Sequence, residues 1–532
     1  MKRPRRIASV YSILAGSLLA AFLALSVLSV RHRTLTYDEA LHFRYGRQIL
    51  ELDSRRFDNS KMPISALNAL PVKISEYMPQ GQLQFVLSKF YTARAVTIVA
   101  GALLGILVFL WARQLYGRAA SILALALFAF EPNLIAHSGL VTTDVYAAVL
   151  IALTVYLFWL YCQRVKLGYA LLVGIALGLS LIAKYTSVLL VPLLPIMAVI
   201  RSLPKIRRVL RERRFPDLRK QFLRTTGHTA LIGSLALLIV NAGFLFRDTF
   251  TPLVSYNLRS NLLRSIQRDS PVLANLPLPI PYPYLEGLDW VYHLERTNFE
   301  GRKRYYLLGN LSNEGFVGYY AVAFLFKTPL AIQLAFGAAS VALLRRRGNA
   351  KFFEGEVFLL TPLVLFTLYF NFFNKAQLGL RFFLVAFPYI LVFSSRIASD
   401  WHALPFRGRV GILGLLLYLG ASVLSYFPHY ISYVNELVPN RDLAYRVLAD
   451  SNIDWGQSGW YVQQYVQQHP GSIVDPPQPT SGLILVGVNN FVGITVSPAR
   501  YEWLRRCCEP VDSIGYSYLV FEVEPSQLDP DP

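Results

Sequence analysis

Long apolar runs separated by shorter polar segments are the main feature of the sequence. The first run, IASVYSILAGSLLAAFLALSVLSV at 7–30, contains no charged residue. A helix of about 20 apolar residues can cross the roughly 30 Å hydrocarbon core of a bilayer. The pattern therefore predicts a polytopic α-helical membrane protein with about eleven spans. They are expected near residues 7–30, 94–115, 119–137, 144–162, 167–184, 186–203, 228–246, 317–343, 356–373, 379–396 and 410–428.

Three polar regions interrupt this pattern. In the segment 31–93, YGRQILELDSRRF and QGQLQFVLSKFY are typical of amphipathic helices at a membrane surface. The segment 247–316 is rich in proline and tyrosine and is expected to form a folded loop or lid. Beyond about residue 436, SGLILVGVNNFVG and SYLVFEVEP predict strands and SGWYVQQYVQQHP a short helix. We therefore expect a transmembrane domain over 1–435 and a small extracytoplasmic α/β domain over 436–532.

Composition and charge support a membrane protein. Of 532 residues, 54% are hydrophobic and 16% charged, which is too apolar for a soluble domain. The net charge of +20 comes from short basic segments, including KRPRR at the N-terminus, 205–215 and 345–347, which are expected on the cytoplasmic side. These segments lack the interleaved aromatic residues on which proteins that bind single-stranded nucleic acid stack the bases. We therefore expect them to contact anionic lipid and not nucleic acid.

Two further features concern the ends of the chain. The first apolar run is longer than a cleaved signal sequence requires, so it is expected to be a retained signal anchor. An odd number of spans then places the C-terminus outside. Cys507 and Cys508 are adjacent, and a bridge between them would be strained, so no structural disulfide framework is expected.

Two adjacent carboxylates, Asp38 and Glu39, follow the first apolar run in TYDEALHF. Charge near hydrocarbon is costly unless it is paired or used. Thr36 and Glu39 have the spacing of a capping box with Thr36 as N-cap, so Glu39 could serve only to cap a helix. A capping box does not account for Asp38. A third acid, Asp144, opens the span expected at 144–162, where the helix dipole alone would also favour it.

Three isolated cations accompany these acids. Lys184 interrupts an apolar stretch at an outer turn, Lys327 lies inside the span expected at 317–343, and Arg381 begins the span expected at 379–396. Each could simply extend its charge to the headgroup region. Three cations and the acids at one membrane face are better explained by a site for an anionic, membrane-embedded substrate.

Five short motifs, found in order along residues 1–430, are YDE, EPNLIAHSGLVTTD, AKYT, FLFKTP and LGLRFFLVAFP. Together they resemble the GT-C glycosyltransferases that take sugars from polyprenyl-phosphate carriers, above all the protein O-mannosyltransferase and aminoarabinose transferase branch. SNIDWGQSGWYVQQY also resembles the external tail of bacterial members. No MIR repeats follow, so a protein acceptor is not implied.

The resemblance implies a GT-C fold and a set of site residues. Asp38 matches the family's catalytic acid and Asp144 its second acidic position, so the candidate catalytic residues are Asp38, Glu39 and Asp144. Lys184, Arg381 and, less directly, Lys327 are expected to bind the donor phosphate. Phe382 stands where the family often has a histidine, which weakens a metal site there. No metal ligand is assigned, although two acids could hold a divalent cation.

The expected function is transfer of a hexosyl or pentosyl group from a polyprenyl-phosphate carrier to a lipid, glycan or protein acceptor. It would occur at the extracytoplasmic face of a bacterial inner membrane. Cations can stabilise the departing phosphate, so one carboxylate base that activates the acceptor could suffice. Three alternatives stay open: a transporter or flippase for lipid-linked sugars, a polyprenyl-diphosphate-dependent ligase, and a non-catalytic scaffold. A transporter would be expected to show internal repeats and charges near the bilayer midplane.

Overall fold

The computed structural model describes residues 3–53, 59–212, 215–301, 303–345 and 352–528. Parts of several predicted segments lie outside these described residues. They belong to the external segments 31–93 and 247–316, the N-terminal basic segment, the basic segments at 205–215 and 345–347, and the end of the C-terminal domain.

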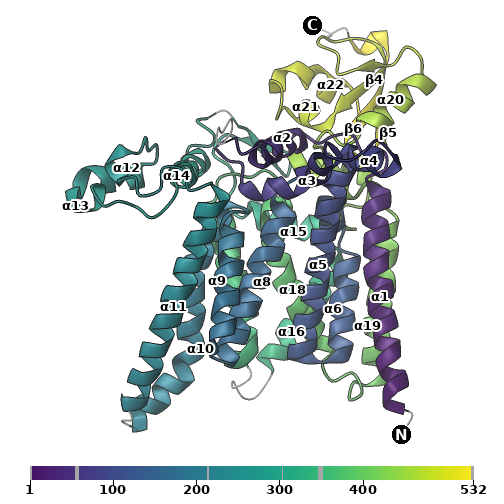
Figure 1. The fold of residues 1–532 in the computed structure, drawn as a ribbon. Coiled ribbons are helices and arrows are strands. Elements are labelled where there is room, and N and C mark those ends of the chain that lie inside the picture. Colours follow the sequence, from purple (N-terminus) through teal and green to yellow (C-terminus); the bar gives the residue numbers. More distant parts are fainter. Residues whose placement is uncertain (1–2, 54–58, 213–214, 302, 346–351, 529–532) are drawn as a thin grey trace.

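A bundle of long helices forms the body of the molecule, with the N-terminus at one end (Figure 1). The bundle helices are α1 (Arg3–Ser29), α5 (Phe90–Tyr116), α6 (Arg118–Ala129), α7 (Pro132–Ser138), α8 (Asp144–Gln163), α9 (Leu167–Leu181), α10 (Leu190–Glu212), α11 (Phe215–Gly243), α15 (Tyr319–Lys327), α16 (Leu330–Leu344), α17 (Val357–Leu368), α18 (Phe387–Ser394) and α19 (Phe406–Leu424).

The helix lengths agree with the predicted spans. Among the described residues, 8 helical segments are long and apolar enough to cross a membrane, and two bent helix pairs raise this number to 10. The predicted span at 167–184 is α9, a helix of 15 residues that packs against α8 and α11. The prediction of a polytopic α-helical protein is therefore confirmed.

Glycine and proline set the breaks between consecutive helices. Gly117, with φ of +90°, ends α5 and precedes α6, a backbone conformation that glycine adopts without strain. Glu131 accepts a hydrogen bond from the Leu134 amide at 2.6 Å and so caps α7, which meets α6 at 62°. Pro329 separates α15 from α16, and these helices meet at 113°. The span predicted at 317–343 is thus a bent pair.

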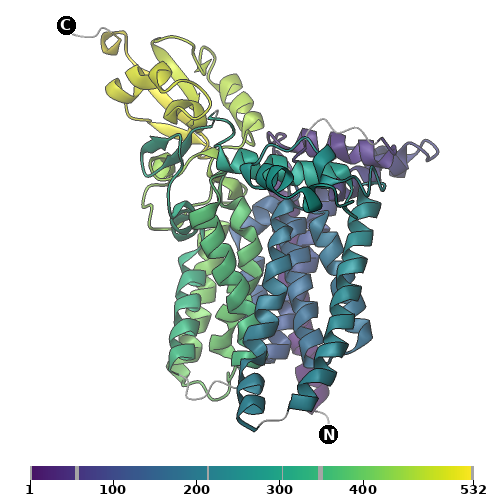
Figure 2. The same cartoon turned by 90° about the vertical axis from the view of Figure 1, so that its left-hand side faces the viewer.

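Shorter elements cover the end of the bundle opposite the N-terminus (Figures 1 and 2). The segment predicted to hold interfacial helices contains α2, α3 and α4, and none of the side chains of α4 is buried. The segment predicted as a lid contains three helices and a two-stranded hairpin. The elements are α2 (Glu39–Leu50), α3 (Ala66–Ser75), α4 (Gln82–Leu87), α12 (Asn261–Asp269), α13 (Pro271–Ala274), α14 (Tyr282–Arg296), β1 (Tyr305–Leu307) and β2 (Asn310–Ser312).

A small α/β unit at the C-terminal end of the chain lies at the same end of the bundle (Figure 1). Its sheet has the order β3-β4-β6-β5, with β4 antiparallel to β6 and Gly482 opposite Val523. The two strands and the helix expected from the sequence are present as β4, β6 and α20. Cys507 and Cys508 are joined as a disulfide, which corrects the expectation from their adjacency. The elements are α20 (Gly459–Gln468), β3 (Ile473–Val474), β4 (Gly482–Gly487), α21 (Val488–Val492), α22 (Glu502–Cys507), β5 (Asp512–Ile514) and β6 (Tyr518–Val523).

Candidate active site

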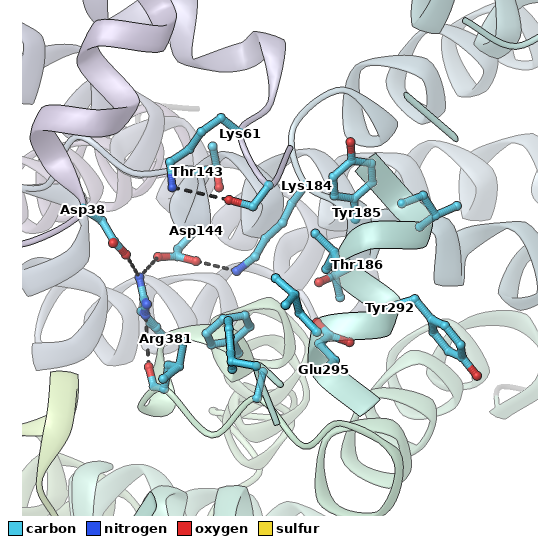
Figure 3. A pocket seen from close by; sticks show the side chains of 18 of the residues that line it. Asp38, Lys61, Thr143, Asp144, Lys184, Tyr185, Thr186, Tyr292, Glu295 and Arg381 are labelled. Atoms are coloured by element: carbon cyan, nitrogen blue, oxygen red, sulfur yellow. Dashed lines mark hydrogen bonds and ion pairs between the residues drawn. The ribbon is translucent and has the colours of Figure 1, made fainter. Parts of the chain in front are cut away.

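A cavity of about 570 Å³ lies where the bundle meets the covering segments (Figure 3). Its walls come from the residues before α2, the first turn of α8, helix α14 and two 3₁₀ helices, η2 (Tyr185–Leu189) and η6 (Leu380–Ala386). Four of the six predicted site residues line it: Asp38, Asp144, Lys184 and Arg381. The structure therefore brings together charges that are up to 343 residues apart in the chain.

Asp38 and Arg381 form an ion pair at the edge of this cavity. The Arg381 Nη1 atom donates to Asp38 Oδ2 at 2.6 Å, and the two side chains are 11% and 18% exposed. Arg381 Nε donates to the Leu378 carbonyl oxygen at 3.0 Å, which fixes the plane of the guanidinium group. Both side chains still reach the cavity, so a substrate there can contact either one.

Asp144 and Lys184 extend the pair into a row of alternating charges. Lys184 Nζ lies 2.5 Å from Asp144 Oδ1, and Asp144 Oδ2 is 3.9 Å from Arg381 Nη1. That second oxygen accepts no hydrogen bond from any described residue. The ring of Phe382 lies 4.2 Å from Lys184 Nζ, so it provides a cation–π contact at the position where the sequence suggested a departure from the family.

The surroundings of Asp38 keep its carboxyl group ionised. Burial by itself would raise the pKa of Asp38. The opposing effects of Arg381, Lys61 and His42 together outweigh burial, so the pKa lies below the usual range. His42 also lines the cavity, and burial lowers the pKa of its imidazole to about 3. At neutral pH His42 is therefore uncharged, whereas Asp38 carries a negative charge and is a weak base while it is paired with Arg381.

Glu39 lies outside the cavity lining and forms a buried ion pair instead. Its Oε2 atom accepts from Arg94 Nη2 at 2.7 Å and from the Thr36 amide at 2.9 Å. Its Oε1 atom accepts from Arg94 Nε and from the Val141 amide, at 2.9 and 3.0 Å. The Glu39 contact with the Thr36 amide is the one a capping box requires. However, α2 begins at Glu39 with Asp38 as the capping position, so the expectation that Thr36 is the N-cap is wrong.

Lys327 also lies away from the cavity lining. It ends α15 at the bend before Pro329 and is 2% exposed. Its ammonium group donates to the carbonyl oxygens of Ile431 and Asn452, each at 2.6 Å. The structure therefore does not group Lys327 with Lys184 and Arg381.

The cavity contains polar residues that the sequence analysis did not single out. Lys61 is 7% exposed and lies beside Asp38 and Asp144, on the wall that covers them (Figure 3). On the opposite side, α14 contributes Glu295, whose Oε2 atom accepts from the Tyr369 hydroxyl group at 3.2 Å. Burial raises the pKa of Glu295 to about 7. Both residues belong to long polar segments in which no motif or isolated charge distinguishes them.

No group of three or more His, Cys, Asp and Glu side chains that could hold a metal ion is present among the described residues. In the cavity, the carboxylates of Asp38 and Asp144 are both paired with cations. A divalent ion would have to displace Arg381 or Lys184 from them. The donor set present fits an anionic ligand better than a metal.

One family model matches part of the chain. Residues 78–214 match the family model for dolichyl-phosphate-mannose-protein mannosyltransferases. This range includes Asp144 and Lys184, together with the motifs EPNLIAHSGLVTTD and AKYT. No curated protein matches the chain in sequence.

The solved structures that match this chain include the following two. ArnT from Cupriavidus metallidurans bound to undecaprenyl phosphate shares 12% identity with a TM-score of 0.45, over 97% of this chain and 98% of that one. The archaeal oligosaccharyltransferase AglB from Archaeoglobus fulgidus, in complex with an inhibitory peptide and a dolichol-phosphate, shares 12% identity with a TM-score of 0.45. That match covers 87% of this chain and 62% of AglB. The match to this family model bears out the resemblance to protein mannosyltransferases over residues 78–214.

Proposed function

We propose that this protein transfers a sugar from a polyprenyl-phosphate carrier to an acceptor hydroxyl group of a lipid, glycan or protein. The observation that carries the proposal is the row formed by Asp38, Arg381, Asp144 and Lys184 along one cavity at the end of a membrane bundle. Two cations beside hydrocarbon suit a lipid-linked phosphate, and an ionised carboxylate beside them suits a hydroxyl acceptor. The family match over 78–214 supports the same chemistry.

In the proposed reaction, the acceptor oxygen attacks the anomeric carbon of the donor sugar. The bond between this carbon and the phosphate oxygen breaks, and the polyprenyl phosphate leaves with the electron pair. Lys184 and Arg381 stabilise the charge that grows on the leaving phosphate. Asp38, which is ionised beside Arg381, accepts the proton of the acceptor hydroxyl group as the new carbon–oxygen bond forms and makes that proton acidic.

The basic segments support an extracytoplasmic location for this reaction. Arg113 and Arg118 lie at the end of α5 and the start of α6, at the same end of the bundle as the N-terminus (Figure 1). Helices α2 and α14, which contribute residues to the cavity lining, lie at the opposite end, as does the C-terminal domain. Because short basic loops favour the cytoplasm, we place the cavity on the outer face of a plasma membrane, which would be a bacterial inner membrane.

The proposal can be tested with purified protein and defined donors. Each donor would carry one sugar on a polyprenyl monophosphate or diphosphate, and mass spectrometry would identify the products formed with lipid, glycan and peptide acceptors. We expect transfer from a monophosphate donor, with release of polyprenyl phosphate. Transfer from diphosphate donors alone would instead identify a ligase. Movement of intact donor across vesicle membranes without any bond cleavage would identify a transporter.

A further inference from the structure

The C-terminal domain reaches the candidate site through one short segment, residues 451–457 with the sequence SNIDWGQ. We call this segment the clamp. It lies before α20, and most of its side chains are buried, with Asn452 at 1% and Trp455 at 7% exposure. Its contacts go to the two pieces of chain that carry Arg381 and Asp38.

The indole ring of Trp455 supports the guanidinium group of Arg381. The Cζ atom of Arg381 lies 4.2 Å from the ring centroid, closer than the 5.2 Å to the ring of Phe382. Stacking on an aromatic face restricts a guanidinium group, and such contacts contribute about 0.5 to 2 kcal/mol. Trp455 therefore packs against the guanidinium group of Arg381, where it limits rotation of the cation.

The backbone around Arg381 is held by the same segment. Asn452 Oδ1 accepts from the Leu380 amide at 2.9 Å, and Ser451 Oγ donates to the Leu378 carbonyl oxygen at 2.5 Å. Gly379, between them, has φ of +85°, and a Cβ atom there would lie 2.4 Å from Ser451 Oγ. Only glycine allows this approach, so the loop and the clamp fit each other closely.

The segment that carries Asp38 pairs with the clamp through its backbone. The Tyr37 amide donates to the Trp455 carbonyl oxygen, and the Thr34 amide donates to the Gln457 carbonyl oxygen, both at 3.2 Å. Asp38 follows directly after Tyr37. The clamp thus contacts Arg381 through side chains, and through main-chain hydrogen bonds it contacts the segment that leads directly into Asp38.

Lys327 and Tyr319 fix the clamp in turn. Lys327 Nζ donates to the Asn452 carbonyl oxygen at 2.6 Å, and Asn452 Nδ2 donates to the Tyr319 hydroxyl group at 2.8 Å. A buried ammonium group needs such acceptors because leaving it without them is costly. This arrangement gives Lys327 a role as an anchor of the clamp.

We propose that the clamp is a built-in part of the candidate active site and that Trp455 and Asn452 are positioning residues for Arg381. The proposal rests on the function proposed above. It assigns the C-terminal domain a role in catalysis, since the domain supplies the support that holds Arg381 between Asp38 and the donor phosphate. Positional errors of about 1 Å can cost about 100-fold in rate, so a loosened Arg381 should affect turnover strongly.

The kinetic test compares three tryptophan substitutions in full-length protein. We expect Trp455→Leu to lower kcat by about 10- to 100-fold with a smaller change in KM for the donor, because Arg381 would act mainly on the leaving phosphate. Trp455→Phe keeps an aromatic face and should recover much of the loss. Trp503→Leu removes a tryptophan from α22 in the same domain and should retain wild-type kcat. Equal kcat for wild type and Trp455→Leu would overturn the proposal, as would equal losses in Trp455→Leu and Trp503→Leu.

A second measurement does not depend on activity. Phenylglyoxal reacts with accessible guanidinium groups, and mass spectrometry of the labelled protein reports its reaction with Arg381. We expect faster labelling of Arg381 in Trp455→Leu and Asn452→Ala, and wild-type labelling in Trp503→Leu. Unchanged labelling in both clamp variants would overturn the clamp. Absence of transfer by the wild-type protein would contradict only the proposed function, because the labelling still decides whether the clamp holds Arg381.

Discussion

The neighbouring residues Asp38 and Glu39 each pair with an arginine, yet their surroundings differ sharply. Glu39 and Arg94 are 0% and 6% exposed, and both oxygens of Glu39 accept two or more hydrogen bonds. The Asp38 pair is more exposed and borders a cavity of about 570 Å³. A carboxylate whose hydrogen-bonding capacity is filled contributes to folding, whereas one that reaches a cavity can contact a substrate.

The largest expected effect is on the rate of the Asp38→Asn variant. Asparagine keeps the size of the side chain but cannot accept the proton, and loss of a general base typically costs about 10² to 10⁴ in rate. We expect kcat to fall by this factor while donor affinity and protein yield persist. The rate is to be measured as sugar transfer by purified, folded protein. Near wild-type turnover would show that Asp38 is not the base.

Changes at the Glu39 pair should act on folding. Arg94→Ala leaves a buried carboxylate without its partner, and breaking a buried ion pair costs about 3 to 5 kcal/mol of stability. Thermal unfolding in detergent should therefore show a large decrease in Tm. Glu39→Gln, which can still accept from the Thr36 amide, should be milder. If either variant folded normally but lost transfer completely, Glu39 would belong to the reaction.

The two cations of the cavity should control use of the donor. Lys184→Ala and Arg381→Ala each remove a charge-assisted contact, and such hydrogen bonds contribute about 1.5 to 3 kcal/mol. We expect kcat/KM for the polyprenyl-phosphate donor to fall by about 10- to 100-fold in each variant. Arg381→Lys should recover only part, since the planar fork is lost. Lys327→Met removes an anchor of the clamp, so it should lower Tm and kcat with a smaller change in the affinity for the donor.

The smallest expected effect concerns pH and Glu295. Burial raises its pKa to about 7, with Tyr369 and Lys184 as facing groups that oppose the rise. Below this pH the carboxyl group of Glu295 is neutral, and above it a third carboxylate, in addition to Asp38 and Asp144, is charged in the cavity that would hold the donor phosphate. Donor affinity should therefore fall by a few-fold as pH rises through 7, and Glu295→Gln should remove this dependence. Glu286→Gln, on the same helix but outside the cavity lining, should keep it.

The sequence predicted the bundle well because the hydrophobic effect acts on every span in the same way. A charge within or next to an apolar run is costly and therefore indicates a candidate functional residue. This reasoning identified Asp38, Asp144, Lys184 and Arg381. Asp38 and Glu39 could not be separated from each other. Their arginine partners lie 343 and 55 residues away, and no local pattern reports which partner each acid contacts.

Lys327 shows where this reasoning fails. In the sequence it is an isolated lysine among apolar residues, just like Lys184. The bend of 113° before Pro329 turns it toward the carbonyl oxygens of Ile431 and Asn452, more than 100 residues later in the chain. Lys61 and Glu295 were missed for the opposite reason. They belong to polar segments, where charged residues are common and a functional one cannot be distinguished from the rest.

The most direct test is a structure of the Asp38→Asn protein with an intact polyprenyl-phosphate sugar. The slowed variant should retain the donor long enough to be observed by electron cryomicroscopy. The account predicts a phosphate group within hydrogen-bonding distance of Lys184 and Arg381, with the anomeric carbon facing residue 38 across the cavity. A donor phosphate bound outside this cavity, or a sugar directed away from residue 38, would contradict it.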